Sequence, residues 1–140
     1  MSYNVYFADI TQEMHQRDIE KSLANLLRED EIISKSSSEG ITALKMHFGE
    51  ADTPNTVSPS LVKIIVDIIQ KKGCDVFLTD TNTLYVGQRA NAVDHLHLAH
   101  SHGYTIENTG APVLILDGLR GKNFIELEVD YEICNKVKLA

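Results

Sequence analysis

The stretch SPSLVKIIVDIIQKKGCDVFLTD, residues 58–80, constrains the fold more than any other part of the sequence. Its opening serine and proline are typical of a helix start, because serine caps the first turn and proline lacks only a donor that would have no partner there. Apolar residues recur at helical spacing over 61–71, and Gly73 provides a left-handed stop. A buried strand is predicted directly afterwards, at 75–79, so this stretch indicates the helix and the second strand of a strand–helix–strand unit.

The same alternation of extended and helical patterns continues over the rest of the chain. We expect further strands at 5–7, 41–47 and 113–116, one helix capped by Thr11 with an apolar face of Ile19, Leu23, Leu26 and Leu27, and another at 88–102. The segment FIELEVDYEI, 124–133, alternates strictly, which is typical of an outer strand with one face in water. The order predicts an α/β fold, a three-layer sandwich with a mostly parallel sheet and an alternating outer strand, in a single domain spanning 1–140.

Composition narrows the classes of function. The chain has 140 residues, 43% of them hydrophobic, and a net charge of -7, with no basic cluster larger than the Lys71-Lys72 pair. Nucleic-acid binding is therefore not expected, because it depends on basic surfaces that neutralise phosphate. No apolar run approaches the roughly 20 residues that span a bilayer, and the N-terminus lacks the pattern of a signal peptide. We expect a cytoplasmic location without membrane contact.

Polar residues follow each predicted parallel strand at its carboxyl end. Asp9 follows the first strand. Lys45 and His47 lie at the end of the second strand, and Glu50 follows it. Asp80, Asn82 and Thr83 follow the third strand, and Asp117 and Arg120 the fourth. Because parallel strands end at one edge of a sheet and ligands of α/β folds bind beyond that edge, we expect a ligand site there. The alternative is that each residue only forms a turn, since Asp, Asn and Thr bond readily to local backbone.

Side-chain chemistry suggests roles within this edge. His47 and Asp80 are the candidate catalytic residues, and the candidate ligand-binding residues are Lys45, Glu50, Asn82, Thr83, Arg89, His95 and Asp117. His47 ends an otherwise apolar strand and precedes Gly49, so a general acid or base, a metal ligand and a turn residue all remain open. The sequence does not define a set of metal ligands.

Four histidines share the helix predicted at 88–102, namely His95, His97, His100 and His102. His95 and His102 lie on one face but about 10 Å apart along the axis, which is too far for one metal ion. We therefore expect this histidine face to be a partly solvated surface. His95 is the nearest of the four to the strand-end edge.

Several specific kinds of site are not expected, because the chain lacks residues that they require. Phosphate-binding loops and dinucleotide fingerprints need several glycines at fixed spacing, which the chain lacks. Asp80 ends a buried strand as the nucleophile of a haloacid-dehalogenase-like phosphatase does, but Asn82 stands where the second acid would be, so the general acid is missing. Cys74 and Cys134 form no CxxC motif, and the chain cannot assemble a zinc or iron–sulfur site from its own cysteines.

The segments LKMHFGE, VSPSLVKIIVDIIQKKG, FLTDTNTLYVGQRANAVDHL and GAPVLILDGLRG resemble the N-terminal part of the uncharacterised iron–sulfur centre proteins, members of the domain of unknown function 362 family. The resemblance extends from about Val5 to Ala140. The polar and glycine positions that match are Lys45, His47, Gly49, Glu50, Asp80, Asn82, Thr83, Tyr85, Arg89, Asn91, Asp94, His95, Asp117, Gly118 and Gly121.

This resemblance implies that the chain is the N-terminal lobe of a longer protein. Such proteins carry a further α/β portion and a ferredoxin-like insertion with two 4Fe–4S clusters, whose cysteine motifs this chain lacks. The family implies no particular reaction. The partners that we expect are a small ligand, the C-terminal or ferredoxin lobe, or a second copy of the chain.

Three hypotheses for function result. In the first, a lobe of a redox-linked protein binds a small anionic or metal-associated ligand, with Lys45 and Arg89 countering charge, His47 handling a proton and Asp80 orienting it. In the second, a non-catalytic scaffold docks a partner lobe. In the third, the least favoured, the chain is a metal-dependent phosphatase-like hydrolase.

Overall fold

The structure is a computed structural model that describes residues 5–29, 40–51, 53 and 56–140. Its helices are α1 (Gln16–Glu29), α3 (Pro59–Gln70), α4 (Ala92–Ser101) and α5 (Ile106–Thr109). Its strands are β1 (Ile41–Lys45), β2 (Asp75–Asp80), β3 (Val113–Ile115), β4 (Ile125–Glu128) and β5 (Lys136–Leu139). Among the described residues no helix has the length and apolar character that a membrane span requires.

The central sheet has the order β1-β2-β3, and both neighbouring pairs are parallel. The register aligns Leu44 with Leu78 and Leu78 with Val113, so the middle strand is paired along both edges. The predicted α/β class and parallel sheet are therefore confirmed. Because the three strands share one direction, their carboxyl ends lie at one edge of the sheet.

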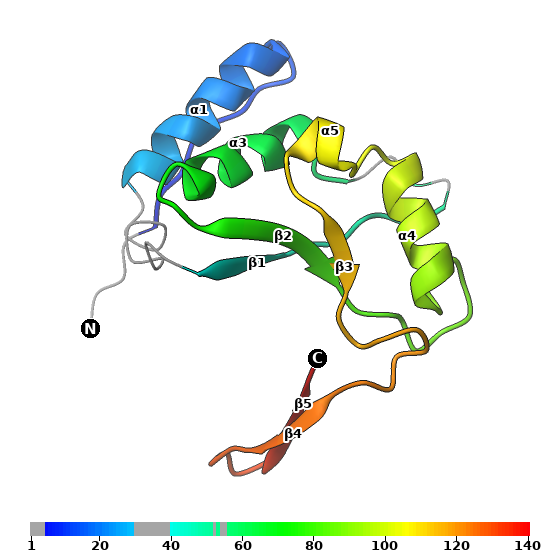
Figure 1. The fold of residues 1–140 in the computed structure, drawn as a ribbon. Coiled ribbons are helices and arrows are strands. Elements are labelled where there is room, and N and C mark those ends of the chain that lie inside the picture. The colour runs from blue at the N-terminus through cyan, green and yellow to red at the C-terminus, as the bar shows by residue number, and fades with distance from the viewer. Residues whose placement is uncertain (1–4, 30–39, 52, 54–55) are drawn as a thin grey trace.

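One hydrophobic core lies between this sheet and the helices. Its buried members are Phe48, Val62, Val66, Ile69, Cys74, Val76, Leu78, Ala99, Tyr104 and Ala111. Figure 1 shows α1 and α3 above the sheet in that view, and α1 packs on α3. On the other face of the sheet, Ile41 and Leu114 are 75% and 47% exposed. The described residues thus supply the helical layer on one face and leave apolar side chains open on the other.

The strand predicted within 124–133 forms as β4, but it does not extend the central sheet. It pairs with β5 in a separate antiparallel sheet, which Figure 1 shows on the side away from α1 and α3. Ile125 opposes Leu139 on one face, while Glu126 opposes Lys138 on the other. All four β4 residues are exposed. The expected position as an outer strand of the main sheet is therefore corrected, because the opposite charges and apolar residues of β5 supply a closer partner.

Two predictions near the N-terminus are wrong. Residues 5–7 form no strand, and Val5 and Phe7 are exposed, because a three-residue apolar run has stability only where a neighbouring strand pairs with it. The first helix begins at Gln16, and Thr11 instead closes a turn in which its carbonyl accepts the Met14 N–H at 3.2 Å. Asp9 therefore follows no strand.

Helix ends follow local hydrogen bonding more closely than composition. Ser58 holds the N-cap position and Pro59 the first turn of α3, as predicted, although the Ser58 hydroxyl pairs with the Ser60 hydroxyl and caps no backbone N–H. Gly73 has the predicted left-handed conformation. The next helix starts later than the predicted residue 88, because the Asn91 side chain accepts the N–H groups of Val93 and Asp94 and fixes the cap there.

Candidate functional site

Asp80, the last residue of β2, is the centre of the polar cluster at the strand-end edge. The residue is 4% exposed, and its carboxylate meets three groups from three segments of the chain. Lys45 Nζ lies 2.7 Å from Oδ1, Arg89 Nη1 lies 3.4 Å from Oδ2, and His95 Nε2 lies 3.6 Å from Oδ2. The end of β1, the loop after β2 and α4 therefore meet at one side chain.

The surroundings of Asp80 keep it ionised. Burial alone would raise the pKa of this carboxyl, but its interactions with His95, Lys45 and the Thr81 N–H outweigh burial and hold the pKa at about 2. The Thr81 N–H donates to Oδ1 at 2.8 Å. At neutral pH the carboxylate is therefore a fixed negative charge that attracts Lys45, Arg89 and any proton on His95.

Arg89 links Asp80 to a second acidic group, Glu50. Its Nε donates to Glu50 Oε1 at 3.0 Å, its Nη2 donates to the same oxygen, and Nη2 also lies 2.6 Å from the Tyr85 hydroxyl. The Tyr85 hydroxyl in turn donates to Glu50. The hydrogen bond from Arg89 lowers the pKa of Glu50, and the hydrogen bond to Glu50 raises the pKa of Tyr85. Arg89 is buried, so it holds this part of the edge together.

Asn82 and Asp117 join the ends of β2 and β3. The Asn82 N–H donates to Asp117 Oδ2 at 2.9 Å, and Asn82 Nδ2 donates to Asp117 Oδ1 and to the Gly118 carbonyl, both at 2.8 Å. Gly121 packs against this pair in a left-handed conformation, and a Cβ there would lie 3.1 Å from Asp117 Oδ2. The Asn82 Oδ1 atom is buried, and no hydrogen bond joins it to another residue of the described part of the chain.

Thr83 closes the loop that carries Tyr85 and Arg89. Its N–H donates to the Arg89 carbonyl at 2.9 Å, and its hydroxyl donates to the Tyr85 carbonyl at 3.1 Å. This part of the edge is held by backbone contacts, as the turn-forming alternative anticipates. The loop as a whole positions Arg89 toward Asp80.

His47 lies at the end of the β1 segment and is exposed. Its Nδ1 accepts the Gly49 N–H at 2.9 Å, and Gly49 has a left-handed backbone with φ 99°. An accepting Nδ1 carries no proton, so the neutral ring presents Nε2–H as a donor. No hydrogen bond or ion pair among the described residues joins His47 to Asp80, and the two candidate catalytic residues act at different points of the edge.

His95 is fully buried beside this cluster. The Phe48 ring meets it edge-on at a centroid distance of 5.8 Å, and neither ring nitrogen has a hydrogen-bond partner among the residues that the structure describes. His97 and His100 are exposed, in line with the solvated surface predicted for this helix. His102 differs, because it is half-buried and its Nδ1 lies 2.8 Å from the Phe48 carbonyl. His102 thus helps to hold the backbone that follows His47.

The structure brings most of the residues predicted for the strand-end edge together. Lys45, Glu50, Asp80, Arg89 and His95 form one connected cluster, and Asn82, Thr83 and Asp117 form the adjoining turns. Asp9 and Arg120 are exposed and bond to none of these residues. Tyr85 is the site residue that the assignment of roles missed, since nothing in its local sequence shows that it reaches Glu50 across the edge.

The described residues present no metal site, and the two cysteines of the chain do not form an iron–sulfur site. In the described part of the chain, no group of three His, Cys, Asp or Glu side chains converges as metal ligands would. A 4Fe–4S cluster takes four cysteine thiolates. The chain has two cysteines: Cys74 is buried in the core, and Cys134 is exposed, with its Sγ 2.9 Å from the Lys136 carbonyl.

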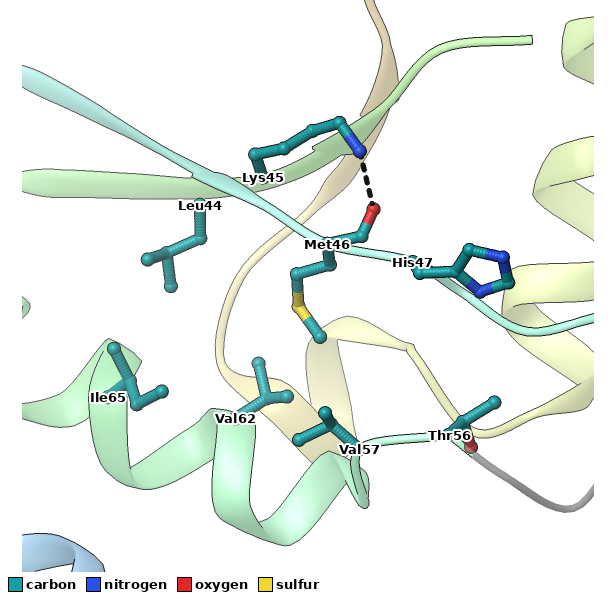
Figure 2. Close-up of a pocket in the computed structure, with 8 residues that line it drawn as sticks. All are labelled: Leu44, Lys45, Met46, His47, Thr56, Val57, Val62 and Ile65. Carbon is teal, nitrogen blue, oxygen red and sulfur yellow. Dashed lines mark hydrogen bonds between the residues drawn. The ribbon is translucent and has the colours of Figure 1, made fainter. Parts of the chain in front are cut away.

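An apolar cavity of ≈ 390 Å³ borders the polar cluster. Its lining residues are Leu44, Lys45, Met46, His47, Thr56, Val57, Val62 and Ile65, shown in Figure 2. The cavity lies between β1 and α3, and two of its lining residues, Lys45 and His47, belong to the strand-end edge. Polar and apolar surfaces therefore meet at the end of β1.

Comparison with known proteins gives one match. A family model described as a domain of unknown function, DUF362, matches residues 42–140, which include every residue of the cluster. Searches of curated proteins and of solved structures found no match. Since the match covers well over half of the chain, this protein belongs to the DUF362 family.

Proposed function

We propose that the strand-end edge binds a small anionic ligand, and that Lys45 and His47 contact it. One observation carries the proposal: the buried carboxylate of Asp80 fixes Lys45, whose side chain is 65% exposed and so can meet a ligand. Ligands of open α/β folds bind beyond the carboxyl ends of the parallel strands, which is where this ammonium group lies.

Two hydrogen-bond donors remain available at this point. The Lys45 ammonium has three donors, of which one meets Asp80 Oδ1 and one the Met46 carbonyl at 3.2 Å. The third has no partner among the described residues, so it can meet a ligand. His47 adds its Nε2–H, because its Nδ1 is occupied by Gly49. Together they suit a carboxylate or phosphate oxygen, which binds best to charged or strongly polar donors.

The buried residues act as positioning groups in this proposal. Asp80 holds the exposed Lys45 in place, and the buried Arg89 joins Asp80 to Glu50. The buried His95 ring lies beside the Asp80 carboxylate, with its Nε2 3.6 Å from Oδ2. The proposal keeps the proton-handling role of His47 and gives Asp80 the role of orienting Lys45.

A redox role follows less directly, because it depends on the family resemblance. We infer from the family resemblance that this lobe works beside iron–sulfur clusters held by cysteines outside this chain. The support is the resemblance alone, since Cys74 and Cys134 do not make a cluster site. The lobe would then bind the ligand, and the clusters would be carried by the neighbouring lobe.

Calorimetric titration with sodium acetate and with inorganic phosphate tests the binding role. We expect Lys45→Met and His47→Gln each to weaken binding by about tenfold, the equivalent of one charge-assisted hydrogen bond. Lys63→Met is the matched control, because Lys63 is also a partly exposed lysine paired with an aspartate, Asp67 at 2.9 Å, but lies on α3. Equal weakening in Lys63→Met, or none in either edge variant, would contradict the proposal.

A second candidate function, docking of a partner lobe, is favoured by a different observation. The open face of the sheet exposes Ile41 and Leu114, and the β4–β5 pair exposes an apolar face containing Ile125 and Leu127. Exposed apolar surface of this kind marks interaction sites. Sedimentation of the chain alone and with the C-terminal lobe checks this function. A chain that sediments as a monomer both alone and in the presence of the C-terminal lobe would contradict the docking function.

A further inference from the structure

The cavity beneath β1 has an apolar interior that ends at polar groups. Figure 2 shows the apolar side chains Leu44, Met46, Val57, Val62 and Ile65 gathered around it, from β1 on one side and from α3 and the preceding loop on the other. The Lys45 side chain leaves β1 on the opposite side, and the His47 ring lies at the end of the row. The interior therefore offers hydrocarbon contacts, and the polar contacts lie where β1 ends.

We propose that the ligand of this edge is an amphipathic anion, a carboxylate or phosphate that carries a short hydrocarbon chain. The chain occupies the cavity, and the anionic group meets Lys45 and His47 at the end of β1. This inference rests on the proposed function, because it names the class of ligand that the same edge takes.

The alternation of β1 explains why one strand serves both parts of such a ligand. Successive side chains of a strand point to opposite faces, so Leu44 and Met46 face α3 while Lys45 faces Asp80. Lys45 and His47 both line the cavity, so a ligand beside His47 can contact both faces of β1. Asp80 fixes the positively charged Lys45 ammonium there, and this charge complements the anionic group of the ligand.

The size and chemistry of the cavity agree with a hydrocarbon chain. A volume of ≈ 390 Å³ is at the lower end of small-molecule sites, which span about 300–1,000 Å³. Water in such an apolar space has few polar partners, so displacing it by hydrocarbon is favourable. Each buried methylene strengthens binding by about fourfold.

A series of straight-chain carboxylates, from acetate upward, tests the inference on the whole chain. Calorimetry gives Kd for each carboxylate and for the alcohol of the same length, and the ¹³C-methyl NMR signal of Met46 reports on the cavity, with Met14 as the internal reference. We expect Kd to fall by about fourfold per methylene until the cavity is filled. The Met46 signal should shift and the Met14 signal should not.

A pair of variants separates the cavity from the rest of the surface. Val57→Phe places a larger side chain at the cavity, and Val93→Phe makes the same change on α4; the two valines are 52% and 54% exposed, so neither change disturbs the core. We expect Val57→Phe to abolish the dependence on chain length and to leave acetate binding in place. Val93→Phe should change neither.

The outcomes distinguish this inference from the function on which it rests. Anion binding that depends on Lys45 but not on chain length overturns the amphipathic ligand and leaves the proposed function standing. Equal binding of alcohols and carboxylates, with a clear dependence on chain length, overturns the anionic group and with it the proposed function. An unchanged chain-length series in Val57→Phe places the hydrocarbon elsewhere and overturns the cavity assignment.

Discussion

Asp80 shows at the scale of one residue how a buried charge can organise a surface. Burial alone would raise the pKa of its carboxyl, but His95, Lys45 and the Thr81 N–H outweigh burial and hold the pKa at about 2 instead of the ordinary 3.8. A carboxyl whose pKa is lowered by folding stabilises the folded state above its ordinary pKa. That contribution is lost as the pH falls through the folded value.

Replacing Asp80 by Asn therefore has a pH-dependent effect. We expect Asp80→Asn to lower the free energy of unfolding by about 2 kcal/mol at neutral pH, and the difference from the unchanged protein to shrink as the pH falls from about 4 to 2. Urea unfolding at several pH values measures it. Asp67→Asn is the control, since the exposed Lys63–Asp67 pair contributes at most about 0.5 kcal/mol. A loss for Asp80→Asn that is no larger than for the control, or that does not change with pH, argues against a buried anchor.

At the scale of elements, prediction succeeded where the signal was local. The helix after Ser58 and the strands at 75–79 and 113–116 are each defined by contiguous apolar residues with clear ends, and each is found within a residue or two. The strand at 5–7 failed and β5 was missed, because a strand is stable through a partner that the local sequence does not specify. The predicted start of α4 at residue 88 was wrong, because the Asn91 side chain caps the helix and sets its start at Ala92.

The N-caps of α3 and α4 are expected to differ in their contribution to stability. Asn91→Ala should lower the free energy of unfolding by about 1 kcal/mol, because the Asn91 side chain accepts two backbone N–H groups. Ser58→Ala should cost much less, because the Ser58 hydroxyl caps no N–H of α3. Thermal unfolding of both variants compares them directly. A Ser58→Ala loss equal to that of Asn91→Ala would contradict the capping geometry.

At the scale of the whole molecule, the parallel direction of the strands decided how much of the site was predictable. It brought Lys45, Asp80 and Asp117 to one edge, as the sequence indicated. The burial of Arg89 and the reach of Tyr85 to Glu50 were not predictable, because they depend on the path of the loop after β2. The separate position of the β4–β5 pair was also not predictable, since strict alternation describes one strand and not its neighbour.

The β4–β5 pair should be the least protected part of the sheet structure. A two-stranded pair with exposed side chains is barely stable in water, whereas β2 is buried between two strands and α3. We expect its amides to exchange with deuterium well before those of β2, as followed by NMR. Equal protection in the isolated chain would show that the pair packs on another surface.

Mapping the binding of inorganic phosphate by amide chemical shifts tests the central claim most directly, namely that the carboxyl ends of the parallel strands form one anion site. The account predicts the largest shifts at residues 45–50 and 80–83, with reduced shifts in Lys45→Met. Shifts confined to α1 and the outer face of α3, or unchanged in that variant, would contradict it.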